Sequence, residues 1–111
     1  MRLTASRASV LGGQPGRALY AAAKGAVDSF TIGLANEVGK VGIRVNCVRP
    51  GPIVTEAHDD RGGEAQLNKV TAAIALGRPG RPHEVAETIV FLLSDASSYM
   101  TGALVDVSGG R

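Results

Sequence analysis

The sequence predicts an α/β fold with a parallel sheet. Glycine and proline divide the 111 residues into short segments, and strand-like and helix-like patterns alternate along them. Such alternation is typical of parallel sheets, whose strands are connected by helices. With 44% hydrophobic and 20% charged residues, the composition indicates one small globular domain over residues 1–111 and excludes a chain that is mainly disordered.

The first half of the chain is expected to contain a short strand, a long helix and a second strand. A very short opening segment precedes a turn-rich loop at residues 9–17. Apolar residues then recur at helical spacing over residues 18–40, and glycines mark the end of this helix. Residues 43–49 are rich in β-branched side chains and are followed by a proline-glycine turn, so they are predicted to form a strand.

The second half is expected to contain two helices and a last strand. A polar loop at residues 56–63 leads into a weaker helix near residues 64–75. A clear amphipathic helix begins at Pro82 and runs through HEVAETIVFLLSD, with one apolar side made of Val85, Ile89, Leu92 and Leu93. The segment ALVDVSGG alternates before two glycines and is predicted to be a terminal strand.

Charge, cysteine content and hydropathy exclude several classes of protein. Twelve basic against ten acidic residues give a net charge of +2, and the arginines are scattered, which argues against a nucleic-acid partner. The single cysteine, Cys47, excludes a disulfide framework and is expected to be buried in a strand. No apolar run is long enough to span a bilayer, so we expect a cytoplasmic protein without a membrane partner. The loop residues Glu56, His58, Asp59 and Asp60 could suggest a metal site. No metal site is predicted, because oxygen-rich loop residues without a second ligand cluster are usually solvated.

Tyr20 and Lys24 are the strongest candidates for catalysis. They lie four residues apart on the predicted long helix, so both side chains project from one face and can meet one ligand. A neighbouring ammonium favours the phenolate form of tyrosine, which would make Tyr20 a general acid/base. The alternative interpretation is that Tyr20 packs at the helix start while Lys24 is solvated, and the spacing of this pair does not decide between the two.

Two further segments are candidates for the same site. Ser6 in TASRAS could donate a hydrogen bond to a substrate oxygen, and Ser9 is the competing choice. Either serine could instead be a turn residue that bonds its own backbone. The segment Pro50 to Thr55 follows a predicted strand end, where ligands of open α/β sheets bind, although a rigid turn explains it equally well.

Five ordered blocks give these candidates a family context. They are TASRAS, YAAAK, GIRVNCVRPGPIVTE, GRPGRPHEVAETIVFLLSD and SSYMTGALVDVSGG. In this order, and over essentially the whole chain, they resemble the C-terminal half of the compact branch of the short-chain dehydrogenase/reductase family. The polar loop EAHDDRGGEA is similar to that of sugar-dehydrogenase-like members.

This resemblance implies a fold, a reaction and a set of roles. The fold would be part of a Rossmann-type, doubly wound parallel sheet, comprising its last three strands with their helices. The reaction would be hydride transfer between an alcohol, sugars included, and a carbonyl, with NAD or NADP as cofactor. Tyr20 would be the acid/base, Lys24 would also bind the nicotinamide ribose, and Ser6 would orient the substrate. Pro50, Gly51, Ile53 and Thr55 would hold the nicotinamide end of the cofactor, and residues 56–76 would form a lid.

The sequence also departs from the family pattern. It contains no glycine-rich strand-to-helix fingerprint for a pyrophosphate, so the N-terminal half of the cofactor site is expected to be missing. An alternative function follows: a truncated, non-catalytic remnant that associates with full-length relatives. The family forms dimers through the long Tyr-Lys helix, so we expect a homo-oligomer through that helix. An epimerase of the extended branch is disfavoured by RPGPIVT and by the early SGGR ending.

Overall fold

A three-stranded parallel sheet organises the chain. The computed structural model describes residues 2–4, 15–54 and 63–111, and of residues 2–4 and 63–67 it describes the backbone alone. The strands are β1 (Arg2–Thr4), β2 (Asn46–Pro50) and β3 (Leu104–Val107), in the spatial order β1-β2-β3. Both pairings are parallel, with Leu3 opposite Cys47 and Arg49 opposite Asp106. The predicted α/β class with a parallel sheet is confirmed.

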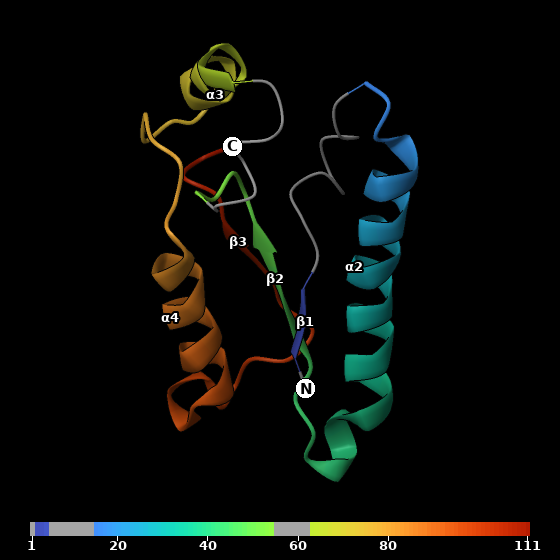
Figure 1. Cartoon of the computed structure of the whole chain (residues 1–111). Helices are drawn as coiled ribbons and strands as arrows, with labels where there is room; N and C mark the ends of the chain where they lie inside the picture. The colour runs from blue at the N-terminus through green and yellow to red at the C-terminus, as the bar shows by residue number, and fades with distance from the viewer. Residues whose placement is uncertain (1, 5–14, 55–62) are drawn as a thin grey trace.

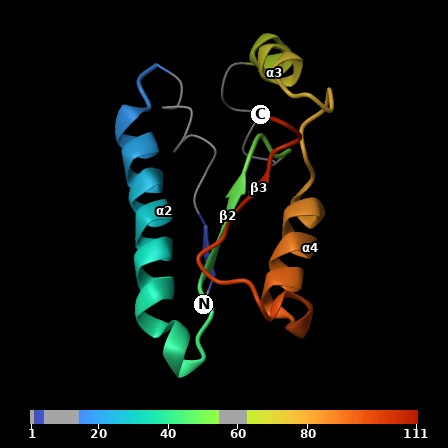
Figure 2. The same ribbon diagram turned by 180° about the vertical axis from the view of Figure 1, so that it is seen from behind.

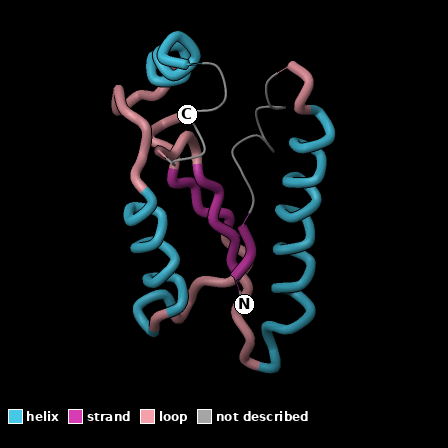
Figure 3. Tube along the Cα trace, viewed as in Figure 1, coloured by secondary structure: helices cyan, strands magenta, loops and turns pink. Residues whose placement is uncertain are grey.

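Helices cover the sheet on two sides. The long helix α2 (Ala18–Val38) contacts β1 and β2, whereas α4 (Pro82–Leu93) contacts β2 and β3. Figures 1 and 2 show the strands between these two helices in both views, and Figure 3 shows the same three layers by type of element. This is the doubly wound arrangement that the family resemblance implies, and its parallel strands with intervening helices are what the alternating pattern predicts.

The long helix ends slightly earlier than predicted. Its α-helical part stops at Val38, and a single 3-10 turn, η1 (Gly39–Val41), replaces the last residues of the predicted helix. Gly42 then adopts a left-handed conformation with φ of 84°, which a glycine adopts without steric cost. Glycine therefore ends this helix as expected, but through a tighter final turn.

The second strand begins three residues later than predicted. Ile43 donates its N–H to the carbonyl of Val38 at 3.3 Å, and Val45 donates to the hydroxyl of Thr101 at 3.1 Å. These backbone groups are thus used at the helix end and in a loop rather than in the strand ladder. The ladder occupies Asn46–Pro50, where Cys47 and Val48 are fully buried, as expected for Cys47.

The remaining elements lie close to their predicted positions. Helix α3 (Gly63–Ala72) and α4 are both present, and a 3-10 turn, η3 (Asp95–Ser97), follows α4. Of the apolar side predicted for α4, Leu92 is buried, but Leu93 is exposed, so that part of the prediction is wrong. The last strand is shorter than the predicted ALVDVSGG segment because Gly109 and Gly110 adopt positive φ angles.

Candidate active site

Tyr20 and Lys24 lie together on the first two turns of α2. The Lys24 Nζ is 5.7 Å from the centre of the Tyr20 ring. The Cζ atom of Arg17 lies 4.4 Å from the same ring centre. Two cations therefore lie near one aromatic ring, within the distance range of cation–π contacts. Tyr20 is 40% exposed and Lys24 is half-buried, so this pair is accessible to a ligand.

The pair lies at the end of the molecule where the strands finish. Because the strands are parallel and α2 runs in the opposite direction, the start of α2 lies at the same end as the carboxyl ends of β2 and β3 (Figure 1). Those strands end at Pro50 and Val107. Ligands of open α/β sheets bind outside this edge. The fold therefore brings Tyr20 and Lys24 to the edge at which the candidate turn also begins.

The turn after β2 is fixed by backbone hydrogen bonds. Gly51 donates its N–H to the carbonyl of Val107 at 3.0 Å, which carries the β2–β3 pairing into the turn. Residues 52–54 then pair with Gly80: its N–H donates to the carbonyl of Pro52, and its carbonyl accepts from Val54, both at 2.9 Å. Pro50, Gly51 and Ile53 therefore lie in one fixed turn at the strand ends.

A glycine is required where this turn meets the last strand. A Cβ atom at Gly51 would lie 2.8 Å from both the Cα and the Cβ of Ser108. Ordinary contacts between such atoms are 3.4–4 Å, so a larger residue fits here only if the backbone moves. Gly51 thus lets the turn pack directly against the end of β3.

Three predicted site residues fall outside the described residues. They are Ser6 and its alternative Ser9, which follow β1, and Thr55, which follows the turn. The first part of the predicted lid, including the acidic loop residues, also lies outside that range. The described part of the site therefore consists of Tyr20, Lys24 and residues 50–53.

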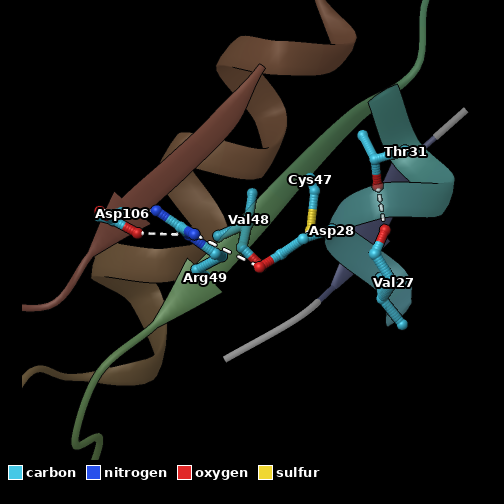
Figure 4. Close-up of polar contacts among 7 residues, drawn as sticks. All are labelled: Val27, Asp28, Thr31, Cys47, Val48, Arg49 and Asp106. Carbon is cyan, nitrogen blue, oxygen red and sulfur yellow. Dashed lines mark hydrogen bonds and ion pairs between the residues drawn. The ribbon is translucent and has the colours of Figure 1, made fainter. Parts of the chain in front are cut away.

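A cluster of three charged side chains that the sequence analysis did not identify lies beside this site. Arg49 forms a two-pronged ion pair with Asp106: its Nε is 2.7 Å from Oδ1 and its Nη2 is 3.1 Å from Oδ2. The Nη1 of Arg49 also lies 3.4 Å from Oδ2 of Asp28 on α2. Figure 4 shows the guanidinium between the two carboxylates. The hydrogen bond to Asp106 is the main cause that raises the pKa of Arg49 above its ordinary value.

The cluster joins the helix to two strands. Asp28 and Arg49 are both 9% exposed, and Thr31 beside them is fully buried, with its hydroxyl donating to the carbonyl of Val27 at 2.8 Å. The Sγ of Cys47 lies 4.0 Å from Oδ1 of Asp28, so the thiol faces the same carboxylate (Figure 4). The only sequence signal for the cluster is that Asp28 continues the four-residue spacing of Tyr20 and Lys24.

Other kinds of site find no support in the described residues. Among residues 2–4, 15–54 and 63–111, no three His, Cys, Asp or Glu side chains gather into a group suited to a metal ion. A search of that same part of the chain finds no helix with the length and hydropathy needed to cross a membrane.

Comparison with known proteins identifies similar sequences and similar solved structures. A family model described as enoyl-(acyl carrier protein) reductase matches residues 2–111. The chain is 50% identical over 100 residues to the uncharacterized oxidoreductase YgfF of Escherichia coli strain K12, covering 89% of this chain and 40% of that protein. It is 43% identical over 100 residues to the 3-oxoacyl-[acyl-carrier-protein] reductase FabG of Chlamydia trachomatis, covering 90% of this chain and 40% of the relative.

The structural comparison agrees with the sequence comparison. The crystal structure of a blue fluorescent protein from a metagenomic library, in complex with NADPH, superposes with a TM-score of 0.89 at 34% identity. The match covers 98% of this chain and 43% of that structure. The chain thus spans about 40% of the length of the curated relatives it matches.

Proposed function

This chain belongs to the short-chain dehydrogenase/reductase family, and on that premise we propose that it serves in NAD(P)-dependent hydride transfer between an alcohol and a carbonyl. The relatives named above are an oxidoreductase and a reductase, and the solved structure is a complex with NADPH. The observation that carries the proposal is the joint placement of Tyr20 and Lys24 at the strand ends. In this proposal residues 1–111 act as one partial cofactor-binding domain.

In the proposed reaction Tyr20 moves the proton. When bound, NAD(P) supplies or accepts the hydride at the carbon atom of the substrate. During carbonyl reduction the Tyr20 hydroxyl gives its proton to the substrate oxygen, and during alcohol oxidation the phenolate takes that proton back. Tyr20 is suited to this role because it is partly exposed, at 40%, and so can reach a substrate. The ammonium of Lys24 lies beside it, 5.7 Å from the centre of its ring.

The residues present fit the nicotinamide end of such a cofactor. Lys24 offers three N–H donors that suit ribose hydroxyls, and it lies on the same helix face as Tyr20. The turn at residues 50–53 is held by its own backbone bonds, which leaves Pro50, Gly51 and Ile53 in place to line a ligand. By family resemblance Thr55 would contribute to the cofactor site, and Ser6, with Ser9 as the minor contender, would orient the substrate.

A binding titration tests the proposal without requiring a substrate. NADH and NADPH are titrated into the full 111-residue chain, with nicotinamide fluorescence and thermal melting as readouts. We expect saturable binding and a raised melting temperature, because a ligand that binds only the folded state stabilises it. Lys24→Met should weaken binding, whereas Lys40→Met, at an exposed position near the other end of α2, should not. No saturable binding to the unsubstituted chain would contradict the proposal.

Two observations point to different substrate classes. The loop EAHDDRGGEA suggests a sugar alcohol, whereas the chlamydial relative is named a 3-oxoacyl-[acyl-carrier-protein] reductase. We propose sugars as the first substrates to assay, with a 3-oxoacyl thioester as the competing class. Oxidation of sugar alcohols by NAD(P) and reduction of a 3-oxoacyl thioester by NADPH, measured at 340 nm, distinguish the two classes directly.

A second candidate function is association with another chain through the outer face of α2. This face consists of exposed small and apolar residues at alternating spacings of four and three: Leu19, Ala23, Ala26, Phe30 and Gly33. Leu19 is 87% exposed and Phe30 is 55% exposed, and such contiguous apolar faces mark interaction sites. The partner would be a second copy of this chain or a full-length relative, the latter being the remnant hypothesis.

Sedimentation velocity tests this association. We expect the unsubstituted chain to sediment as a dimer or larger species, and Phe30→Glu to shift it towards the monomer, because a charge would be buried at the interface. Asn36→Glu, which introduces the same charge at an exposed position of α2 outside the defined face, is the matched control and should leave the distribution unchanged. A monomer at all concentrations for the unsubstituted chain would exclude self-association through this face.

A further inference from the structure

We infer that Arg49 is a positioning residue that sets where Tyr20 and Lys24 lie relative to the turn at residues 50–53. The inference rests on the proposed function and adds a residue outside the acid/base pair. It starts from the position of Arg49, which is the penultimate residue of β2 and directly precedes Pro50 and Gly51. Its guanidinium contacts the helix that carries Tyr20 on one side and the neighbouring strand on the other.

Among the described side chains, those that α2 buries do little else to fix the helix along its axis. The buried residues of α2 are Ala21, Asp28, Thr31 and Ala35, and none of them is a large apolar side chain. The hydroxyl of Thr31 is satisfied inside the helix by the carbonyl of Val27. Small apolar contacts are not directional, so they allow the helix to slide more easily than a charged hydrogen bond does.

The ion pairs among Arg49, Asp106 and Asp28 provide a directional contact between α2 and the sheet. The planar guanidinium of Arg49 is held in one orientation by its two bonds to Asp106, at 2.7 and 3.1 Å. Its third contact, Nη1 to Asp28 at 3.4 Å, then specifies where Asp28 must lie. Because the side chains of Arg49 and Asp28 are only 11% and 12% exposed, the contact between them is screened less than a surface ion pair, whereas Asp106 is 36% exposed.

The helix passes this constraint to the catalytic pair. Asp28 lies one four-residue step after Lys24 and two after Tyr20, so the three side chains share one face of a rigid helix. Arg49 directly precedes the turn at residues 50–53 in the chain, and Asp28 lies on the same helix as Tyr20. Figure 4 shows this link between α2 and β2 through Asp28 and Arg49. The cluster therefore defines the distance between the two halves of the proposed site.

An NMR experiment on the full chain tests the inference without any activity. Tyr99→Phe, at a fully exposed position, leaves Tyr20 as the single tyrosine, so its ring signals are unambiguous. In that background Arg49→Met removes the bridge, and Arg49→Lys keeps the charge but not the two-pronged geometry. We expect both variants to shift the Tyr20 ring signals and the Gly51 amide signal. Leu92→Ala, which opens the core on the α4 side, is a control that destabilises without shifting Tyr20.

Rescue and turnover distinguish positioning from general stability. If Arg49→Met does not fold, the test is made with Arg49→Lys alone. Combining Arg49→Lys with Asp28→Glu should return the Tyr20 signals towards their original positions, because the longer acid restores the bridge. Where the unsubstituted chain shows turnover, Arg49→Lys should lower kcat by about 10- to 100-fold with little change in KM. Tyr20 signals unchanged in both folded Arg49 variants would overturn the inference. Shifted signals without turnover in the unsubstituted chain would support it while contradicting the proposed function.

Discussion

Replacement of Gly51 by alanine should destabilise the chain through one defined contact. The added Cβ atom would lie 2.8 Å from the Cα and Cβ of Ser108, about 0.6 Å short of the lower limit of ordinary contact at 3.4 Å. The turn and β3 would have to separate by that amount, which would stretch the bond from the Gly51 N–H to the carbonyl of Val107, now 3.0 Å. Overpacking of this kind costs about 1–3 kcal/mol.

Thermal melting followed by circular dichroism measures this cost. For a domain of this size each kcal/mol lowers the melting temperature by about 4–8 °C, so a cost of about 2 kcal/mol predicts a drop of about 8–16 °C for Gly51→Ala. Gly25→Ala is the matched control, because a Cβ there would meet nothing within 4 Å and the position is inside α2. This control should be neutral or stabilising by about 0.5–1 kcal/mol. A melting temperature of Gly51→Ala equal to that of the unsubstituted chain would refute the reasoning.

Two further predictions concern ion pairs and helix ends. The pKa of Glu84 is lowered to about 2, first by its hydrogen bond with Arg78 and then by the N–H of Arg81. Because the folded pKa lies below the unfolded value, Glu84 stabilises the fold above pH 4.5 and loses that effect as the pH falls towards 2. The difference in melting temperature between the unsubstituted chain and Glu84→Gln should therefore shrink over this range, and a constant difference would contradict the assignment. Arg44 donates to the carbonyls of Leu92, Ser94 and Met100 at 3.0–3.3 Å. Arg44→Met should lower the free energy of unfolding by about 2 kcal/mol in a urea titration, because charged hydrogen bonds to these carbonyls are lost; no change in the urea midpoint would argue against this role.

The order of elements was predictable because it depends on local patterns. Periodic apolar residues, Pro82 at a helix start and Gly42 after a helix end each act within a few residues, and each lies where it was expected. Tyr20 and Lys24 were predictable for the same reason, since four-residue spacing on one helix fixes their common face. The end of the long helix α2 differed because α-helix and 3-10 geometry are close alternatives for residues 39–41.

The charged cluster was not predictable because it depends on tertiary pairing. Arg49 lies 21 residues from Asp28 and 57 from Asp106 along the chain, so its partners follow only from strand register and helix placement. Exposure was equally hard to predict for single apolar residues. Leu93 and Phe30 fit helical spacing, yet they are 63% and 55% exposed, because helical spacing alone does not determine which face of a helix another element covers.

Turnover by Tyr20→Phe tests the central claim most directly. The substitution removes only the phenolic oxygen, and no hydrogen bond from that oxygen to another described residue supports the fold. Purified chains with and without the substitution are assayed at 340 nm with NADPH and a carbonyl substrate, with melting curves as the check on folding. We predict measurable turnover in the unsubstituted chain and its loss in Tyr20→Phe at an unchanged melting temperature. Equal rates in the two chains would contradict the assignment of Tyr20 as the acid/base.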